Sequence, residues 1–275
     1  MLMKSYMGSN FLGPFLYVGD SCNVRYLSVG FSTSISALTS NHLRLIINSS
    51  RSIYCRDLLL FEYLIKQNFQ TEKILYGPDI IFAISDIYDK SFFYSKVADV
   101  SMISLKSDFI VVQASSKFVK SIDEISDRLK KLRRDLGIKN IVCLPFAKVH
   151  GDLEFSRALA SSLTDCIHYE NPSLFEILYL LSRTQIFVGS SMHGCIVSYS
   201  YGNMFLPIDS KMPKIVQMVK TIMHPRAPAS TQFNIPIPDI FGDLSQVITF
   251  NSLLFKNMND VKASALSALR HAMRL

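Results

Sequence analysis

The chain has 275 residues, of which 49% are hydrophobic and only 19% are charged, so it can bury a substantial core and is not a disordered chain. Its formal net charge of +7 favours anionic partners: an acidic substrate, a phosphate, an anionic membrane surface or a nucleic acid. The densest basic run, residues 128–134, falls within a predicted helix. We interpret this run as a solvated helix face and expect no nucleic-acid partner.

The cysteines and the hydropathy narrow the cellular setting. The five cysteines are widely spaced and include no CxxC pair, so we expect buried free thiols in the reducing cytoplasm and no metal site. The sequence has neither a signal-peptide pattern nor the apolar run of about 18 residues that a membrane span needs. The positive mean hydropathy of +0.23 leaves a peripheral membrane contact or a homo-oligomer open.

Residues 1–100 predict a first, smaller α/β unit, because short apolar runs alternate with helical patterns. Residues 85–101 are polar and aromatic, which is typical of a linker or crossover. The expected strands are residues 26–31, 53–55 and 73–76, and the expected helices are residues 38–48 and 57–67.

Residues 101–275 predict a second, larger unit. The run 109–113 is continuous and apolar, as in a strand buried on both faces of a parallel sheet. A capping-box sequence at Ser121 opens the next helix, which carries an apolar stripe and which Gly137 closes. Further strands are expected at residues 141–144, 166–168, 185–188 and 204–208, and further helices at residues 153–163, 173–182 and 194–201. This alternation predicts an α/β fold with a mostly parallel sheet.

The remaining segments have other patterns. Asn171 is the expected N-cap of the helix over residues 173–182. The proline-rich stretch 224–238 predicts a long loop. Residues 253–275 predict one basic amphipathic helix, which docks on the first unit, lies on a membrane or joins a partner.

The strongest candidate site is the strand–loop–helix junction at residues 188–194, because ligands of open parallel sheets bind beyond the carboxyl ends of the strands. The N–H groups and the positive dipole end of a helix start bind anions. His193 stands at that start, where it can donate to a phosphate or move a proton, and local capping or packing is the alternative. The small residues that let a ligand approach the backbone are Gly189, Ser190, Ser191 and Gly194.

Two other predicted strand ends carry charged side chains. Asp209 and Lys211 follow the strand at residues 204–208, and the alternative is a turn with a surface ion pair. Arg56 ends an earlier strand, where its guanidinium can bind a carboxylate or a phosphate, and the alternative is an ion pair with a neighbouring acid. Residues 77–79 follow a third strand and indicate a turn.

The order of these residues resembles the polysaccharide pyruvyl transferase family over residues 26–211. No Walker loop, dinucleotide fingerprint, kinase motif set or nucleophile elbow is present. The matching pieces are a strand ending near Gly30, Ile-Tyr-Cys-Arg-Asp at 53–57, Tyr-Gly-Pro-Asp at 76–79, Ser-Met-His-Gly at 191–194 and Ile-Asp-Ser-Lys at 208–211.

The resemblance implies two Rossmann-like units similar to the B-type glycosyltransferases, with a short first unit here. It implies a transferase that moves the pyruvyl group of phosphoenolpyruvate onto two hydroxyls of a sugar, forming a ketal. The acceptor is a cell-surface polysaccharide or its lipid-linked precursor at the cytoplasmic membrane face, and no cofactor is needed. His193 and Arg56 are then catalytic, and the donor-binding residues are Ser190, Ser191, Gly194, Asp209 and Lys211. Many members carry Arg in place of Ser191, so we expect that this cation is either missing here or supplied by another residue, with Arg183 and Arg226 as the candidates.

Two other functions stay open. A nucleotide-sugar glycosyltransferase of the same architecture needs a side chain that binds the nucleotide, and Glu176 is the candidate. The second alternative is a non-catalytic relative that retains the fold, because of Ser191 and the short first unit.

Overall fold

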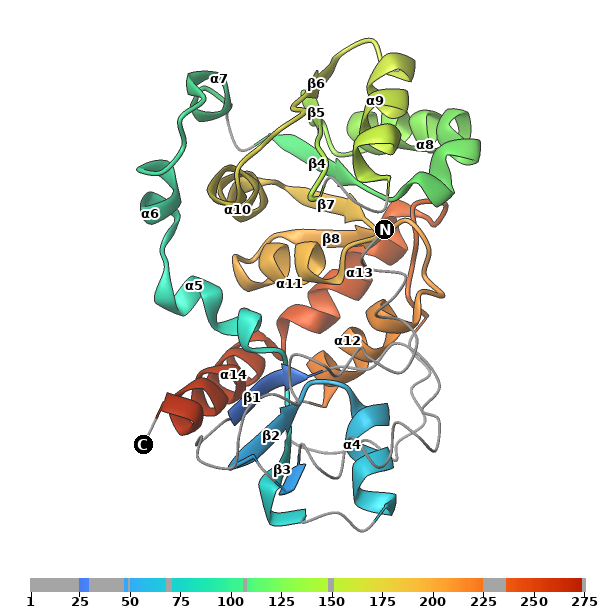
Figure 1. Cartoon of the computed structure of the whole chain (residues 1–275). Coiled ribbons are helices and arrows are strands. Elements are labelled where there is room, and N and C mark those ends of the chain that lie inside the picture. The colour runs from blue at the N-terminus through green and yellow to red at the C-terminus, as the bar shows by residue number, and fades with distance from the viewer. Residues whose placement is uncertain are drawn as a thin grey trace, which may run out of the picture. The chain divides into compact units, whose positions relative to one another are not determined.

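The computed structural model divides into two compact units (Figure 1). The described residues are 25–29, 47–48, 50–67, 71–105, 108–147, 151–224 and 236–273. Unit 1 comprises Met1–Ile80, His224–Ser230 and Ser264–Leu275, and unit 2 comprises Ile81–Met223 and Thr231–Ala263. The boundary that the sequence places at residue 100 therefore falls within unit 2. Most of the predicted helix at 38–48 and most of the predicted loop at 224–238 lie outside the described residues.

Unit 1 contains a parallel sheet of order β1-β2-β3. The strands are β1 (Arg25–Val29), β2 (Ser52–Cys55) and β3 (Ile74–Tyr76), with a short 3-10 helix, η1 (Thr71–Lys73), before β3. Helix α4 (Leu58–Lys66) packs Leu60 and Leu64 on Ile53 and Ile74 of the sheet. Asp57 caps α4, because its carboxylate accepts a hydrogen bond of 2.9 Å from the N–H of Leu59.

Unit 2 contains a five-stranded parallel sheet, which confirms the predicted α/β class. Its order is β6-β5-β4-β7-β8, so the direction in which successive strands are added reverses between β4 and β7. The strands are β4 (Phe109–Gln113), β5 (Asn140–Cys143), β6 (Cys166–His168), β7 (Ile186–Gly189) and β8 (Met204–Pro207). All residues of β4 and β7 are buried, which explains their apolar sequences.

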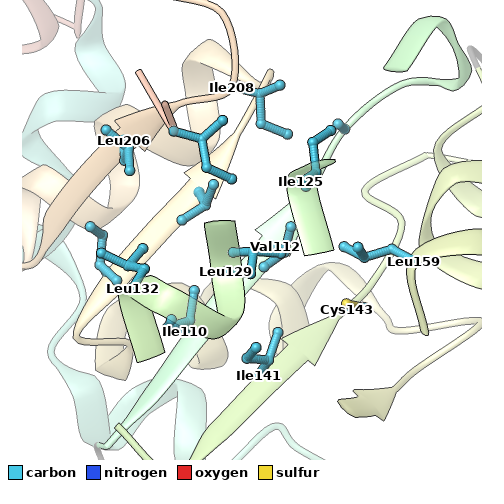
Figure 2. Packing of buried hydrophobic residues seen from close by; sticks show 14 of the residues in the cluster. Ile110, Val112, Ile125, Leu129, Leu132, Ile141, Cys143, Leu159, Leu206 and Ile208 are labelled. Atoms are coloured by element: carbon cyan, nitrogen blue, oxygen red, sulfur yellow. The ribbon is translucent and has the colours of Figure 1, made fainter. Parts of the chain in front are cut away.

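Helices cover this sheet. On one face the core contains residues of α8, α9 and α13 packed on the strands, and Figure 2 shows Ile125 and Leu129 of α8 beside Val112 of β4. On the opposite face α11 lies over β7, with α10 beside it (Figure 1). The helices are α8 (Ile122–Asp135), α9 (Asp152–Ser162), α10 (Leu174–Arg183), α11 (Met192–Ser200), α12 (Pro213–Met223) and α13 (Leu244–Phe255).

Helix ends agree with the sequence only in part. Gly137 (φ 63°) closes α8 as predicted: its N–H bonds to the carbonyl of Arg134, and the next N–H bonds to that of Arg133. The predicted capping box at Ser121 is wrong, because a 3-10 helix, η3 (Ser116–Ser121), runs into α8 and the Ser121 hydroxyl makes no cap bond. The box forms instead at Ser173, which replaces Asn171 as the N-cap of α10.

Two segments differ from the prediction: one that was predicted as a linker is helical, and the predicted tail helix is interrupted. Residues 80–103 contain η2 (Ile80–Ala83) and three short helices, α5 (Ile84–Ile87), α6 (Lys90–Tyr94) and α7 (Val100–Ile103), rather than a linker. The aromatic residues of this segment are what order it, since Phe93 is buried and contacts the ring of Tyr201. The predicted tail helix at 253–275 is interrupted: residues 253–255 end α13, residues 256–257 break the helix, and α14 (Met258–Met273) follows. In the described part of the chain no helix combines the length and the apolar character needed to cross a membrane.

The edge strand β8 is closed by a side chain. Asn251 of α13 is 1% exposed, accepts from the N–H of Phe205 at 3.0 Å and donates to its carbonyl at 3.1 Å. The same amide donates to the carbonyl of Val247 at 2.9 Å. The side chain therefore takes the place of a neighbouring strand and satisfies backbone groups that an edge leaves unpaired.

We predict that Asn251→Ala lowers the free energy of unfolding by about 2–4 kcal/mol, because it leaves buried donors and acceptors unpaired. Urea unfolding followed by circular dichroism measures the change. Gln246→Ala on the same helix is the control: Gln246 is exposed, and an effect within about 0.5 kcal/mol is expected there. Equal effects for the two variants would contradict the edge-closing role.

Candidate functional site

The junction between β7 and α11 continues the sheet directly into a helix N-terminus. Ser190 donates its N–H to the carbonyl of Gln113 at 3.1 Å, which extends the pairing of β7 with β4 by one residue. Ser191 is the N-cap of α11, and its hydroxyl accepts from the N–H of Gly194 at 3.2 Å. The hydroxyl of Ser191 thus stabilises the helix start, a role that the sequence reading did not assign to it.

His193 is the second residue of α11 and is exposed. The helix begins two residues earlier than predicted, so the imidazole belongs to the first turn, where the N–H groups and the dipole favour negative charge. An exposed imidazole at this position is accessible to an anionic ligand.

The end of β8 lies beside this junction. Gly189 and Pro207 are partners in the parallel pairing of β7 with β8, and Ile208 donates its N–H to the carbonyl of Gly189 at 3.1 Å. Asp209 accepts from the N–H of Lys211 at 2.9 Å, which fixes the turn after the strand. Lys211 is exposed. The predicted unit 2 residues therefore meet at the carboxyl ends of two neighbouring strands.

The glycines of the junction have a packing role. A Cβ added to Gly189 would lie 2.3 Å from the ring of Phe187, and one added to Gly194 would lie 2.5 Å from the same ring. The ring of Phe187 is fully buried and stacks on Phe146 at a centroid distance of 5.6 Å. We predicted that these glycines let a ligand approach the backbone, but the ring of Phe187 fills the space beside both of them.

We did not predict a buried polar pair that joins the end of β4 to the start of α9. Gln113 is 4% exposed and donates to the carboxylate of Asp152 at 2.8 Å, and the same carboxylate accepts from the N–H of Phe146 at 3.2 Å. The side-chain oxygen Oε1 of Gln113 is buried and accepts no hydrogen bond from the described residues. A polar residue that ends the otherwise apolar run 109–113 is the signal that could have indicated this pair.

The cation expected to replace the family's Arg at Ser191 is not Arg183. Arg183 ends α10, three residues before β7 begins, so it lies at the opposite end of the strand from the junction. Its guanidinium lies over the ring of Tyr179 at 5.3 Å. Arg226 lies outside the described residues.

Arg56 is described within unit 1, where it forms an ion pair with Asp79. The two side chains follow β2 and β3, which pair in parallel, so their carboxyl ends bring the charges together. Asp79 is 4% exposed and Arg56 is 26% exposed. The alternative of pairing with a neighbouring acid is therefore realised, and residues 77–79, interpreted as a turn, supply the partner.

Glu176, the candidate nucleotide ligand, is engaged in helix capping. Its carboxylate accepts from the N–H of Ser173 at 2.7 Å and from that of Asp99 at 3.4 Å. Burial acts to raise the pKa of Glu176, but these hydrogen bonds outweigh it and hold the pKa below its usual value. Within the described ranges no group of three or more acidic, His or Cys side chains is arranged to hold a metal ion.

Comparisons with known proteins identify a family and a fold. A family model described as polysaccharide pyruvyl transferase matches residues 7–211, which is more than half of the chain. A comparison of the sequence with curated proteins found no match.

Solved structures share the fold at low identity. The UDP-GlcNAc 2-epimerase of Neisseria meningitidis bound to UDP-GlcNAc is 14% identical, with a TM-score of 0.57 over 92% of this chain and 70% of that one. The Staphylococcus aureus MnaA–UDP structure is 12% identical, with a TM-score of 0.56 over 98% and 72% of the two chains. The UDP-GlcNAc 2-epimerase of Methanocaldococcus jannaschii is 10% identical, with a TM-score of 0.55 over 96% and 73%. These likenesses confirm the B-type α/β fold.

We predict that Gly194→Ala lowers the free energy of unfolding by about 1–3 kcal/mol, because the new methyl group overlaps the buried ring of Phe187 and the half-buried ring of Phe146. Chemical unfolding measures the loss. In a Phe187→Leu background the same substitution has a smaller effect, because the ring is gone. If Gly194→Ala leaves stability unchanged in the wild-type background, the packing role is wrong.

We also predict that Arg56→Met lowers the free energy of unfolding by about 3 kcal/mol, because it leaves the buried carboxylate of Asp79 without its cation. Adding Asp79→Asn recovers part of the loss by removing the buried charge. A double-mutant cycle in urea gives both values. Additive losses in the double variant would show that the pair contributes nothing.

Proposed function

The chain belongs to the polysaccharide pyruvyl transferase family, and from this premise we propose that it transfers the pyruvyl group of phosphoenolpyruvate to a sugar, forming a ketal. The acceptor in this proposal is a cell-surface polysaccharide or its lipid-linked precursor. The family supports a polysaccharide acceptor and a transferase reaction in general. The donor and the ketal product are the finer part of the proposal.

The observation that carries the proposal is the meeting of the α11 N-terminus with the β8 end. Phosphoenolpyruvate has a phosphate and a carboxylate, so it needs positive charge and N–H donors. The first turn of α11 offers N–H groups and the positive end of a dipole. Lys211 adds an exposed ammonium on the neighbouring strand end. The reversal of strand order between β4 and β7 is the position where open parallel sheets bind ligands.

His193 suits the proton transfers that the reaction needs. Carbon C3 of the donor gains a proton and carbon C2 forms a bond to the first sugar oxygen. The bond between C2 and the phosphate oxygen breaks, and phosphate leaves. The second sugar oxygen then bonds to C2 and completes the ketal. Each of the two hydroxyls loses a proton. One of these protons balances the proton gained at C3, and the other passes to phosphate or solvent. An imidazole exchanges protons near neutral pH, so His193 is assigned as the acid–base group.

The other residues have supporting roles in the proposal. Ser190, Ser191 and Gly194 form the helix start, and Asp209 holds the turn that carries Lys211. Arg56 keeps its proposed role toward the donor in addition to its ion pair with Asp79. A cytoplasmic location at the inner membrane face, a peripheral membrane contact and a homo-oligomer stay predictions.

The nucleotide-sugar alternative has less support. Both oxygens of Glu176 accept hydrogen bonds from backbone N–H groups, so its carboxylate is occupied in holding α10. The chain's likeness to the UDP-bound structures is a likeness of fold.

The test is phosphate release from phosphoenolpyruvate in the presence of a lipid-linked or polymeric glycan. We predict release with a suitable acceptor and a decrease of about 10²–10⁴-fold for His193→Gln, the range typical of a lost acid–base group. Because the His193 side chain is exposed, we expect the His193→Gln variant to unfold at a temperature close to that of the wild type. His271→Gln replaces another exposed histidine, on α14, and keeps full activity.

Two results would overturn the proposal. One is the absence of both donor binding and phosphate release with every acceptor class tried. The other is a His193→Gln variant that releases phosphate as fast as His271→Gln.

A further inference from the structure

Two cysteines of unit 2, neither of which belongs to the β7–α11 junction, lie in direct contact. The sulfur atoms of Cys143 and Cys166 are 3.0 Å apart. Cys143 is the last residue of β5 and Cys166 is the first residue of β6, and the two strands pair in parallel. The contact is therefore fixed by the sheet and not by a loop.

The two thiols differ in their access to solvent. Cys143 is 0% exposed within the core cluster, where Figure 2 labels it, and Cys166 is partly exposed on β6, an outer strand of the sheet. A soluble oxidant thus meets Cys166 first, while Cys143 is held behind it as a second thiol. This is the arrangement of an attacking and a resolving cysteine.

The pKa values of the two thiols differ in the same sense as their exposure. The hydrogen bond with Cys143 lowers the pKa of Cys166 despite its partial burial, and the same bond together with burial raises the pKa of Cys143. Because the thiolate is the reactive form, Cys166 is the nucleophile of the two. By contrast, burial raises the pKa of Cys55 to about 12 and also raises that of Cys195.

We propose that Cys143 and Cys166 form a reversible oxidation site, in which a peroxide converts the two thiols into a disulfide between neighbouring strands. The Cys166 thiolate attacks hydrogen peroxide, forms a sulfenic acid and releases hydroxide. The Cys143 thiol then attacks that sulfur, the S–S bond forms and water leaves. In total two thiols lose two hydrogens and two electrons, and one peroxide becomes two waters. A thiol reductant such as glutathione reverses the step.

The two side chains meet diagonally across the strand pair, because Cys143 is level with His168 and Cys166 is level with Ile141. The sulfur atoms must close from 3.0 Å to the disulfide bond length of about 2.0 Å. The ends of the strands are already joined, since Tyr169 donates its N–H to the carbonyl of Cys143 at 3.1 Å. Three residues after Cys143, Phe146 stacks on Phe187 beneath the junction, so the oxidised bond would form close to the segment that supports it.

The experiment treats the full chain under native conditions with hydrogen peroxide, blocks the remaining thiols by alkylation and maps the cysteines by mass spectrometry. The expected result is a loss of two of the five alkylated cysteines and a linked Cys143–Cys166 peptide that dithiothreitol separates. Burial protects Cys55 and Cys195 from the peroxide, so both are recovered as alkylated thiols when the protein is unfolded for alkylation.

Variants separate the two roles. In Cys143→Ser the oxidation of Cys166 stops at a sulfenic acid that dimedone traps, and in Cys166→Ser the buried Cys143 stays reduced. Cys22→Ser is the control and keeps the linked peptide. Recovery of both Cys143 and Cys166 as alkylated thiols, under conditions that oxidise free glutathione, would overturn the proposal, and so would a disulfide that uses Cys22. The wild-type mapping decides the question even if a variant does not fold.

Discussion

The parallel pairing of β4 with β7 is the constraint on which unit 2 depends. The chain adds β5 and β6 on one side of β4 and then returns to add β7 and β8 on the other side. This return places the start of α11 next to the end of β4, where the N–H of Ser190 bonds to the carbonyl of Gln113. The order of the strands alone, independent of the side chains, brings the N-terminus of α11 next to the end of β8.

Packing beneath the junction then limits its sequence. The buried ring of Phe187 fills the space next to both Gly189 and Gly194, and Phe146 stacks on it, so neither glycine can carry a side chain without moving that ring. The cap bond between the Ser191 hydroxyl and the N–H of Gly194 holds the first turn in place. The groups above the junction, His193 and Lys211, are exposed. A rigid base beneath exposed polar groups is what an organised anion site needs.

The sequence was informative where the fold buries apolar strands. The strand at 109–113 and the stripe on α8 followed from apolar periodicity, because a parallel sheet covers both faces of its strands. It was less informative where contacts join distant residues. The pairing of Arg56 with Asp79 needs β2 and β3 side by side, and the contact of Cys143 with Cys166 needs β5 beside β6. The predicted capping box at Ser121 does not form, because the preceding 3-10 helix changes the backbone conformation that the cap requires.

Phosphoenolpyruvate binding at the start of α11 is the central claim, and a crystal structure with the donor tests it most directly. We expect the phosphate or the carboxylate to lie against the first-turn N–H groups of α11, with His193 and Lys211 in contact with the donor. Donor bound away from these residues at saturating concentration, or a crystal that binds no donor there, would show that the start of α11 is not the donor site.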